Sequence, residues 1–174
     1  SHPDDKHVIV SSDSDFYQLL SSNVSQYNGI TDTWITIDGF FDEKGNHIID
    51  KKTKEAKLPP DPEWLLFEKC MRGDSTDNVF SAYPKVRKNK LQEAFADRHN
   101  QGFAWNNIMN ARWVDHNGNE KIVKQEYATN QKIIDLTKQP DDIKEMMFSV
   151  IDQHIKQPKK VANVGIHLLK FCNK

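Results

Sequence analysis

The first third of the chain carries β-branched and aromatic residues in short apolar runs, a pattern that predicts strands. Residues 7–11 (HVIVS) form such a run, and its length and composition are typical of a buried strand in a parallel sheet. The run stops at a polar cluster, 12–15, after which apolar residues recur at helical spacing. The other elements predicted here are strands over 24–29 and 33–39, joined by an Asn28-Gly29 turn, and a small hairpin over 40–49.

A charged connector over 50–62, punctuated by prolines, separates this part from the rest and is expected to be exposed. After it, apolar residues recur with the period of a helix. Pro62 suits the first turn of a helix that ends at Gly73. Further helices are predicted after 74–77 and over 88–98, 104–113, 123–136, 141–156 and 161–171, with an exposed turn at 115–119. The chain is therefore predicted to be an α/β protein with a strand-rich part, 1–60, and a mainly helical part, 61–174.

With 174 residues, of which 37% are hydrophobic, the chain is long enough for one domain with a core and short for two. It contains no apolar run near the roughly 20 residues that span a bilayer, and its first residues lack the pattern of a secretory signal. We therefore expect a cytoplasmic protein with no membrane partner. Two cysteines, Cys70 and Cys172, are too few for a disulfide framework and lack the spacing of a zinc site, so both are expected to be buried or inert thiols.

The net charge of −1 hides a strong asymmetry along the chain. Residues 1–50 carry nine acids and two lysines, a charge of −7, whereas residues 51–174 carry 22 basic and 16 acidic residues, a charge of +6. A near-neutral total normally argues against a nucleic-acid partner. An acidic end joined to a basic body instead allows each charge a separate role, although an uneven solvated surface explains the same numbers.

Two acidic clusters stand out against this background. Asp13 and Asp15 follow the end of the first predicted strand, and Asp74 and Asp77 lie in the GDSTD turn after a predicted helix. Carboxylates two apart at a strand end can face one cation, and carboxylates three apart lie on one face of a helical turn. Hard divalent cations such as Mg²⁺ and Mn²⁺ prefer oxygen ligands of this kind. The pattern therefore indicates a magnesium site rather than a zinc site.

Each cluster also has a simpler explanation, because Asp and Ser are favoured at helix N-caps. Asp13 would then cap the helix after the first strand, and Asp74 or Ser75 would cap the next one. An EF-hand fits poorly, since Tyr17 stands at the fifth position of the loop and the required glycine is missing. A phosphoaspartate receiver would use a strand-end aspartate but has no role for the second cluster. The two clusters together favour metal binding over capping.

A third feature is the basic segment 85–90 (KVRKNK), which carries four cations and no acid. A helix start normally prefers acidic residues, so cations at this place indicate a negatively charged ligand. Phosphate, contacted by Lys or Arg and by backbone amides at a helix N-terminus, is the natural candidate. Tyr83 and Trp105 are available to stack on bases, but aromatic residues at this spacing are more typical of a core.

The stretches VIVSSDSDFYQLL and KCMRGDSTDNVFSAYPKVR resemble the metal-binding and DNA-binding segments of the 5′ nuclease superfamily, and its phage branch most closely. That superfamily comprises flap endonucleases, the 5′ nuclease domains of bacterial DNA polymerases, and phage 5′ to 3′ exonucleases, including the phage ribonuclease H. The resemblance implies a nuclease that hydrolyses phosphodiester bonds at 5′ ends, flaps or RNA primers in DNA replication or repair. It also implies a location in the host cytoplasm if the enzyme is phage-encoded.

By this resemblance, the metal-binding and catalytic carboxylates of a site for two Mg²⁺ or Mn²⁺ ions are Asp13, Asp15, Asp74 and Asp77. Asp13 and Asp15 would hold metal directly, while Asp74 and Asp77 would lie further back and act through water. The segment after Asp77 resembles the helix-three-turn-helix that grips the backbone of duplex DNA. Its implied DNA-contacting residues are Ser75, Lys85, Arg87, Lys88 and Lys90.

The chain departs from the family pattern in two places. Residues 80–84 stand where the family has a glycine-rich hairpin. We therefore expect phosphate to be bound by the cations of 85–90, rather than by the backbone amides of such a hairpin and a potassium ion held there. The strand-end aspartate, helical arch and Glu-x-Asp-Asp helix that precede this part in the family have no counterpart, and Asp4 and Asp5 lie too close to the strand to supply one. We therefore expect the C-terminal half of a 5′ nuclease, either a fragment or the product of a divided gene, that is inactive without an N-terminal half in the same or a separate chain.

In fold terms, residues 1–60 would form the C-terminal part of the α/β catalytic domain, with a partial parallel sheet and a small hairpin. Residues 61–174 would form a helical region that contains the helix-three-turn-helix. The expected partners are branched or 5′-ended duplex DNA, with an RNA–DNA hybrid as a variant, and the missing nuclease half. Two other functions fit the same residues: a non-catalytic module that binds duplex DNA by its structure, and a structural or assembly protein whose acids are incidental.

Overall fold

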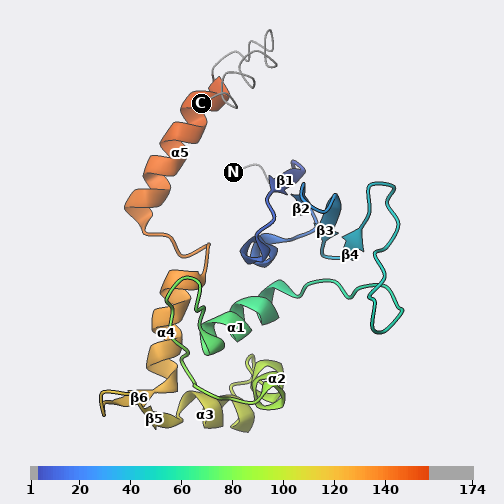
Figure 1. Cartoon of the computed structure of the whole chain (residues 1–174). Coiled ribbons are helices and arrows are strands. Elements are labelled where there is room, and N and C mark those ends of the chain that lie inside the picture. The colour runs from blue at the N-terminus through green and yellow to red at the C-terminus, as the bar shows by residue number, and fades with distance from the viewer. Residues whose placement is uncertain (1–3, 157–174) are drawn as a thin grey trace. The chain divides into compact units, whose positions relative to one another are not determined.

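The strands and helices of the chain appear in Figure 1, a computed structural model that describes residues 4–156. The chain forms two units, which divide between Lys138 and Gln139 and are described separately. The strands of the first unit are β1 (His7–Val10), β2 (Val24–Asn28), β3 (Thr33–Thr36), β4 (Gly39–Phe41), β5 (Arg112–Val114) and β6 (Glu120–Ile122). Its helices are the 3₁₀ helix η1 (Ser14–Leu19) and the α-helices α1 (Pro62–Arg72), α2 (Lys88–Ala96), α3 (Phe103–Met109) and α4 (Val123–Ile134). The second unit contains α5 (Asp141–Lys156).

The first four strands form one mixed sheet in the order β1-β2-β3-β4. β1 pairs with β2 in parallel, and the later strands pair antiparallel. Ile35 and Phe40 are partners across β3 and β4, and they pack with Leu20, which follows η1, in a small core. Phe41 also pairs with His47, as the predicted hairpin requires. The sheet and helices confirm the predicted α/β class and the strand expected over 24–29. The strand expected over 33–39 is shorter than predicted: β3 ends at Thr36, and the chain turns there so that Gly39 of β4 pairs back with Thr36.

β1 is parallel, as predicted, but it is not a buried strand. Val8 is 48% exposed and Val10 is 74% exposed. β1 is the edge strand of the sheet and pairs only with β2 among the described residues. Successive side chains of a strand point to opposite faces, so Val8 and Val10 share the face opposite Ile9. The prediction of burial is therefore wrong for the described part of the chain.

α1 begins and ends where the sequence predicts. The carboxylate of Asp61 caps it by accepting a hydrogen bond from the Trp64 amide at 3.0 Å, and Pro62 occupies the first turn. Gly73 ends the helix with a φ of +74°, and a Cβ at this position would collide with the carbonyl oxygen of Val79. Only glycine fits both conditions, so Gly73 determines where the GDSTD segment leaves the helix.

The segment after Gly73 is a closed loop rather than the predicted helix. Backbone hydrogen bonds of 2.8 Å run in both directions between Asp74 and Val79, and Asn78 has a φ of +57°. Because this pairing folds the chain back on itself, no helix begins after 74–77. The next helix is α2, whose start at Lys88 matches the prediction over 88–98.

The predicted helix over 104–113 is also shorter than expected. α3 ends at Met109, and β5 then pairs antiparallel with β6. The indole of Trp113 donates a hydrogen bond of 2.9 Å to the carbonyl of Ala82, a contact made from the strand. The carboxylate of Asp115 accepts hydrogen bonds from the amides of Asn117 and Asn119, which closes the exposed turn predicted at 115–119.

Helices α1 to α4 supply the main core of the first unit, which consists of Phe67, Met71, Ala82, Leu91, Ala94, Ile108, Met109 and Val123. Cys70 is buried beside this core, and burial raises the pKa of its thiol to about 12. Cys70 is therefore a neutral, buried thiol near neutral pH, as predicted. Cys172 and the helix expected over 161–171 lie outside the described residues.

α4 and α5 confirm the helices predicted over 123–136 and 141–156. Between residues 4 and 156, no helix is both long enough and apolar enough to cross a membrane.

Asn130, on α4, is a buried amide that joins three segments. Its Nδ2 donates hydrogen bonds to the carbonyls of Cys70, on α1, at 2.8 Å and of Phe80, after the GDSTD loop, at 2.7 Å. Asn130 is only 6% exposed, so water cannot easily replace these bonds. The loop therefore owes part of its position to a side chain of a distant helix.

We expect Asn130→Ala to lower the free energy of unfolding by roughly 3 kcal/mol, because it leaves two carbonyls without their donor. Urea denaturation followed by circular dichroism measures the change. Gln125→Ala is the matched control, since Gln125 is an exposed amide on the same helix. Equal stability of the two variants would show that the Asn130 hydrogen bonds do not hold the loop.

Candidate metal centre

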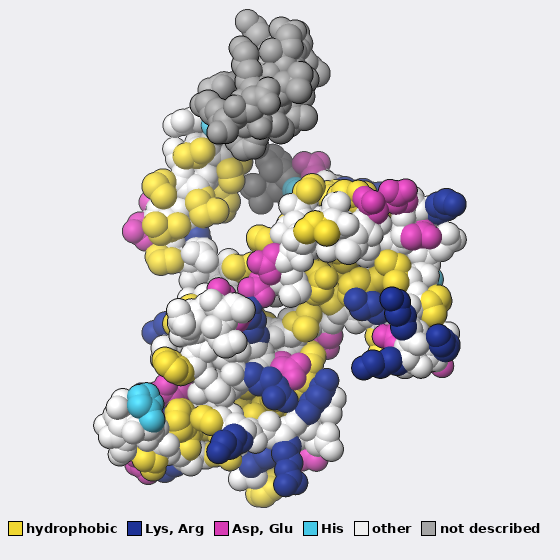
Figure 2. Space-filling view, viewed as in Figure 1, with side chains coloured by type: hydrophobic (Ala, Val, Ile, Leu, Met, Phe, Trp, Pro, Cys, Tyr) yellow, Lys and Arg dark blue, Asp and Glu magenta, His cyan; other side chains and the backbone are white. Residues whose placement is uncertain are grey.

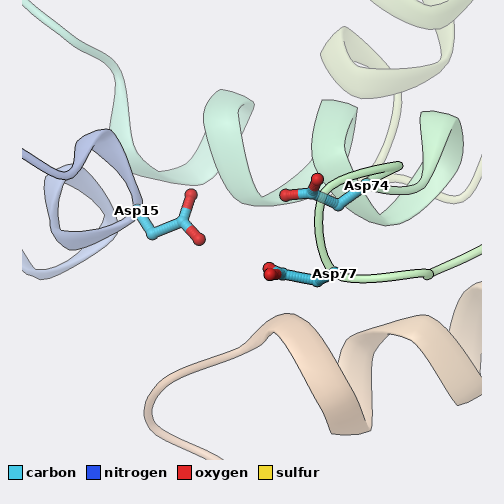
Figure 3. Close-up of side chains that lie close together, drawn as sticks. All are labelled: Asp15, Asp74 and Asp77. Atoms are coloured by element: carbon cyan, nitrogen blue, oxygen red, sulfur yellow. The ribbon is translucent and has the colours of Figure 1, made fainter.

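Three of the four predicted carboxylates come together in the first unit. Asp15 belongs to η1, directly after β1, whereas Asp74 and Asp77 belong to the loop after α1. One carboxylate oxygen of each lies within 4.8 Å of the others (Figure 3). Asp15 and Asp74 are half-buried, and Asp77 is exposed. Two segments that are distant in the sequence thus bring oxygen ligands to one place.

The chemistry of this group suits a hard divalent cation. Carboxylate oxygens are the ligands that Mg²⁺ and Mn²⁺ prefer, usually with water completing the shell. Ligand oxygens of an octahedral Mg²⁺ lie about 3 Å apart in adjacent positions and about 4.2 Å apart in opposite ones, so the three carboxylates would have to move closer together to bind one ion. Asp15, Asp74 and Asp77 therefore suit a shared metal site in donor type, and they lie close enough to reach one ion together.

Lys69, on α1, already places a positive charge between two of these carboxylates. Its Nζ lies 2.6 Å from Oδ2 of Asp74 and also forms an ion pair with Oδ1 of Asp15. Burial acts to lower the pKa of Lys69, but the hydrogen bonds with Asp15 and Asp74 outweigh it and hold the pKa above its ordinary value. The ammonium therefore stays charged, and a divalent cation would have to share these oxygens with it or displace it.

Asp74 is the most firmly held of the three carboxylates. Its pKa lies well below the ordinary range because Lys69 donates to it and because the hydroxyl and amide of Thr76 also donate to its Oδ1. The Asp74 side chain is 14% exposed, so little water screens its attraction to Lys69 and to the donors of Thr76. Asp74 is thus an ionised, preoriented ligand at neutral pH.

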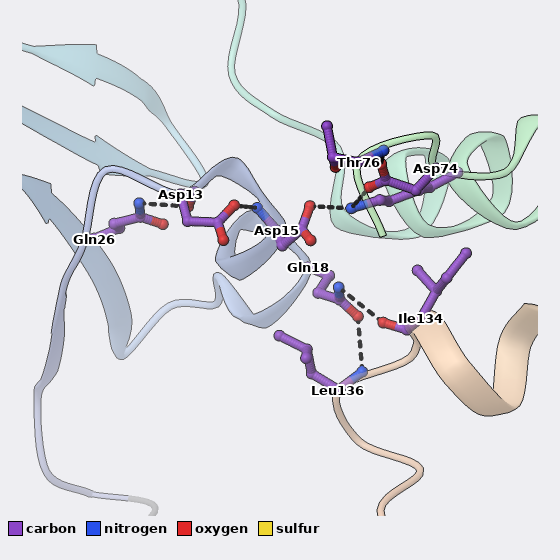
Figure 4. A network of polar contacts seen from close by, with 9 residues as sticks. Asp13, Asp15, Gln18, Gln26, Asp74, Thr76, Ile134 and Leu136 are labelled. Carbon is purple, nitrogen blue, oxygen red and sulfur yellow. Dashed lines mark hydrogen bonds and ion pairs between the residues drawn. The ribbon is translucent and has the colours of Figure 1, made fainter. Parts of the chain in front are cut away.

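Asp13 is placed differently from the other three. Its Oδ1 accepts a hydrogen bond of 2.9 Å from the Asp15 amide, so it caps η1 in the way that the simpler explanation expected. Its backbone carbonyl accepts a hydrogen bond of 2.9 Å from the buried amide of Gln26 (Figure 4). The Asp13 side chain lines the same cleft as Asp15 and Asp74 but is not a member of the group of three.

The two sides of the site are also joined by Gln18 of η1. Its Nε2 donates to the carbonyl of Ile134 at 3.3 Å, and its Oε1 accepts from the amide of Leu136 at 3.0 Å (Figure 4). This pair of bonds attaches the sheet side to the end of α4. A cleft of about 490 Å³ lies between η1 on one side and α1 with its following loop on the other, and its lining includes the carboxylates together with Lys69 and Arg72.

The predicted DNA-contacting residues lie on the loop and at the start of α2. Four of them are exposed, namely Ser75, Lys85, Arg87 and Lys88. Lys90 is half-buried, with its ammonium 5.4 Å from the centre of the Tyr83 ring. Figure 2 shows Lys and Arg side chains over the part of the first unit that contains α2. Arg87 is the N-cap of α2 but makes no capping bond with its side chain, and the first turn holds no acid.

Four residues that matter in this arrangement were not predicted from the sequence: Lys69, Thr76, Gln18 and Gln26. A lysine in the last turn of a helix is common because it suits the helix dipole, so Lys69 carried no distinctive signal. Thr76 lies inside the predicted acidic cluster, where its hydroxyl could have been considered as a donor. The roles of Gln18 and Gln26 depend on contacts between distant segments, which sequence spacing does not reveal.

No model of a known protein family matches the chain, and no curated protein matches it.

The lowered pKa of Asp74 predicts a loss of stability in acid. Ionised Asp74 stabilises the fold at pH values above the pKa that it has in the unfolded chain, about 4. This stabilisation is lost as the pH falls from there toward the lowered pKa of Asp74 in the folded protein. We therefore expect the stability difference between wild type and Asp74→Asn to be largest near about pH 6 and to shrink from about pH 5 to about pH 2. Chemical denaturation at several pH values measures it.

Asp38→Asn serves as the control, because Asp38 is an exposed aspartate with no side-chain ion pair among the described residues. Its difference from wild type should change little over the same range. A stability difference for Asp74→Asn that is independent of pH would contradict the assigned ion pair.

Proposed function

We propose that this chain is the C-terminal part of a metal-dependent 5′ nuclease that hydrolyses phosphodiester bonds in branched or 5′-ended duplex nucleic acid. The observation that carries the proposal is the convergence of Asp15, Asp74 and Asp77 from two distant segments. Capping alone would not bring all three together. The motif order in the sequence supports the same conclusion.

In this proposal, Asp15, Asp74 and Asp77 hold Mg²⁺ or Mn²⁺. When bound, such ions supply an activated water as nucleophile and neutralise charge on the leaving oxygen. Thr76 keeps Asp74 ionised and oriented, and Asp13 orients Asp15 by capping η1. Lys69 keeps two carboxylates at a fixed separation before metal binds.

The exposed cations at the start of α2 are proposed to bind the phosphate backbone. Lys85, Arg87 and Lys88 are exposed, and the first turn of α2 contains no acid to oppose an anion. Backbone contacts carry no sequence information, so recognition would depend on the structure of the nucleic acid. Substrates would include DNA flaps, free 5′ ends and RNA primers on DNA.

Three carboxylates are few for a site with two divalent ions. The family resemblance predicts that further carboxylates come from an N-terminal nuclease half, in the same or a separate chain. The proposal includes that partner, and it predicts little or no cleavage by the present chain without it.

A non-catalytic, structure-selective DNA-binding module is the second candidate. The contact that favours it is the Lys69 ammonium, which already neutralises much of the charge of Asp15 and Asp74 without any metal. In such a module the acids would serve the fold alone, and the cations of α2 would still bind duplex DNA.

A cleavage assay separates the two candidates. The chain is incubated with a labelled 5′-flap DNA and Mg²⁺, with and without an added N-terminal 5′ nuclease half. We expect product only in the combined reaction, and we expect Asp15→Asn to lower its rate by on the order of a hundredfold or more, because one metal ligand is lost.

Asp38→Asn is again the control and should cleave at the wild-type rate. Binding of the flap DNA by gel shift is measured in parallel. Binding without cleavage in every combination would favour the non-catalytic module. Cleavage that Asp15→Asn leaves unchanged would remove the metal assignment.

A further inference from the structure

Two neighbouring hollows on the first unit share Tyr83 and Lys90 in their walls, and together they are called the Tyr83 groove. The first measures about 340 Å³ and adds Lys85 and Arg87. The second measures about 410 Å³ and adds Phe103, Asn107 and Asn110 of α3 and its end. No acidic residue lines either hollow. The groove is therefore positive at one end and carries an aromatic ring and amides at the other.

Phe103 is the unusual residue of this groove. It is 86% exposed, whereas Tyr83 and Trp105 pack against the main core. A phenylalanine side chain this exposed contributes little to the stability of the fold, and its open face is available to another flat ring. The residue that could stack on a base is thus Phe103 rather than Tyr83 or Trp105.

The amides beside Phe103 differ in how they are used. The side-chain amide of Asn106 donates a hydrogen bond of 3.0 Å to the carbonyl of Gly102, the N-cap of α3, so this amide is already used within the helix. Asn107 and Asn110 are exposed, and their side chains have no hydrogen-bond partner among the described residues. Each offers both a donor and an acceptor, which is the combination that the edge of a nucleobase requires.

We propose that the Tyr83 groove binds unpaired nucleotides of a single strand, with one base against Phe103 and its backbone along Lys90, Lys85 and Arg87. The inference rests on the proposed DNA-binding function and adds a substrate class to it, namely duplex DNA with an adjoining single-stranded segment. In a duplex the base faces are stacked on one another, so Phe103 would contribute only where a base is unpaired. The cations attract phosphate in either form.

The test is fluorescence anisotropy of the full chain with a labelled blunt duplex and with the same duplex carrying an oligothymidine extension. We expect wild type to bind the extended duplex more tightly. Phe103→Ala should remove that preference, weakening the extended duplex by on the order of tenfold while leaving the blunt duplex unchanged. Phe103→Trp should retain the preference, because an indole also stacks.

Phe80→Ala is the matched control, since Phe80 is 80% exposed but lies outside the groove, and it should retain the preference. Thermal denaturation checks that each variant is folded. Equal wild-type binding of the two DNAs, or a preference that survives in Phe103→Ala, would overturn the groove and leave duplex binding in place. An absence of binding to either DNA would overturn both this inference and the proposed function.

Discussion

A single ammonium lies between two carboxylates that come from different parts of the chain, and the arrangement of the candidate site depends on it. Without Lys69, Asp15 and Asp74 would face each other as like charges in a partly buried cleft, which is unfavourable. With it, η1 and the loop after α1 are drawn together and Asp74 stays ionised. The same geometry presents oxygen ligands to a divalent cation, so one ion pair serves both the fold and the proposed chemistry.

The contacts around this ion pair have complementary roles. Gln18 ties η1 to the end of α4, and Asn130 ties α4 to α1 and to the segment after the GDSTD loop. Gly73 lets the chain turn so that Asp74 comes next to Lys69. The site is therefore built at the junction of the sheet and the helices, and these contacts help to fix the positions of its carboxylates.

Local patterns predicted most of the fold, and distant contacts account for what they missed. The period of apolar residues located α1, α2, α4 and α5, and the Asn28-Gly29 turn located β2 and β3. The same pattern predicted α3 to be longer than it is, because Trp113 belongs to a strand and bonds to Ala82 from there. A helix was also predicted after 74–77, where the pairing of Asp74 with Val79 instead closes a loop. Motif spacing identified Asp15, Asp74 and Asp77, and the preference of Asp for helix N-caps indicated the capping role of Asp13. No local signal distinguished Lys69.

The carboxylates paired with Lys69 are proposed to bind a divalent metal ion together with Asp77. The most direct measurement is anomalous X-ray scattering from crystals of the chain grown with Mn²⁺. We expect a Mn²⁺ peak bonded to Asp15, Asp74 and Asp77, with the Lys69 ammonium moved away from at least one carboxylate. A structure at saturating Mn²⁺ with no peak among these residues, and with Lys69 still paired to Asp15 and Asp74, would contradict it.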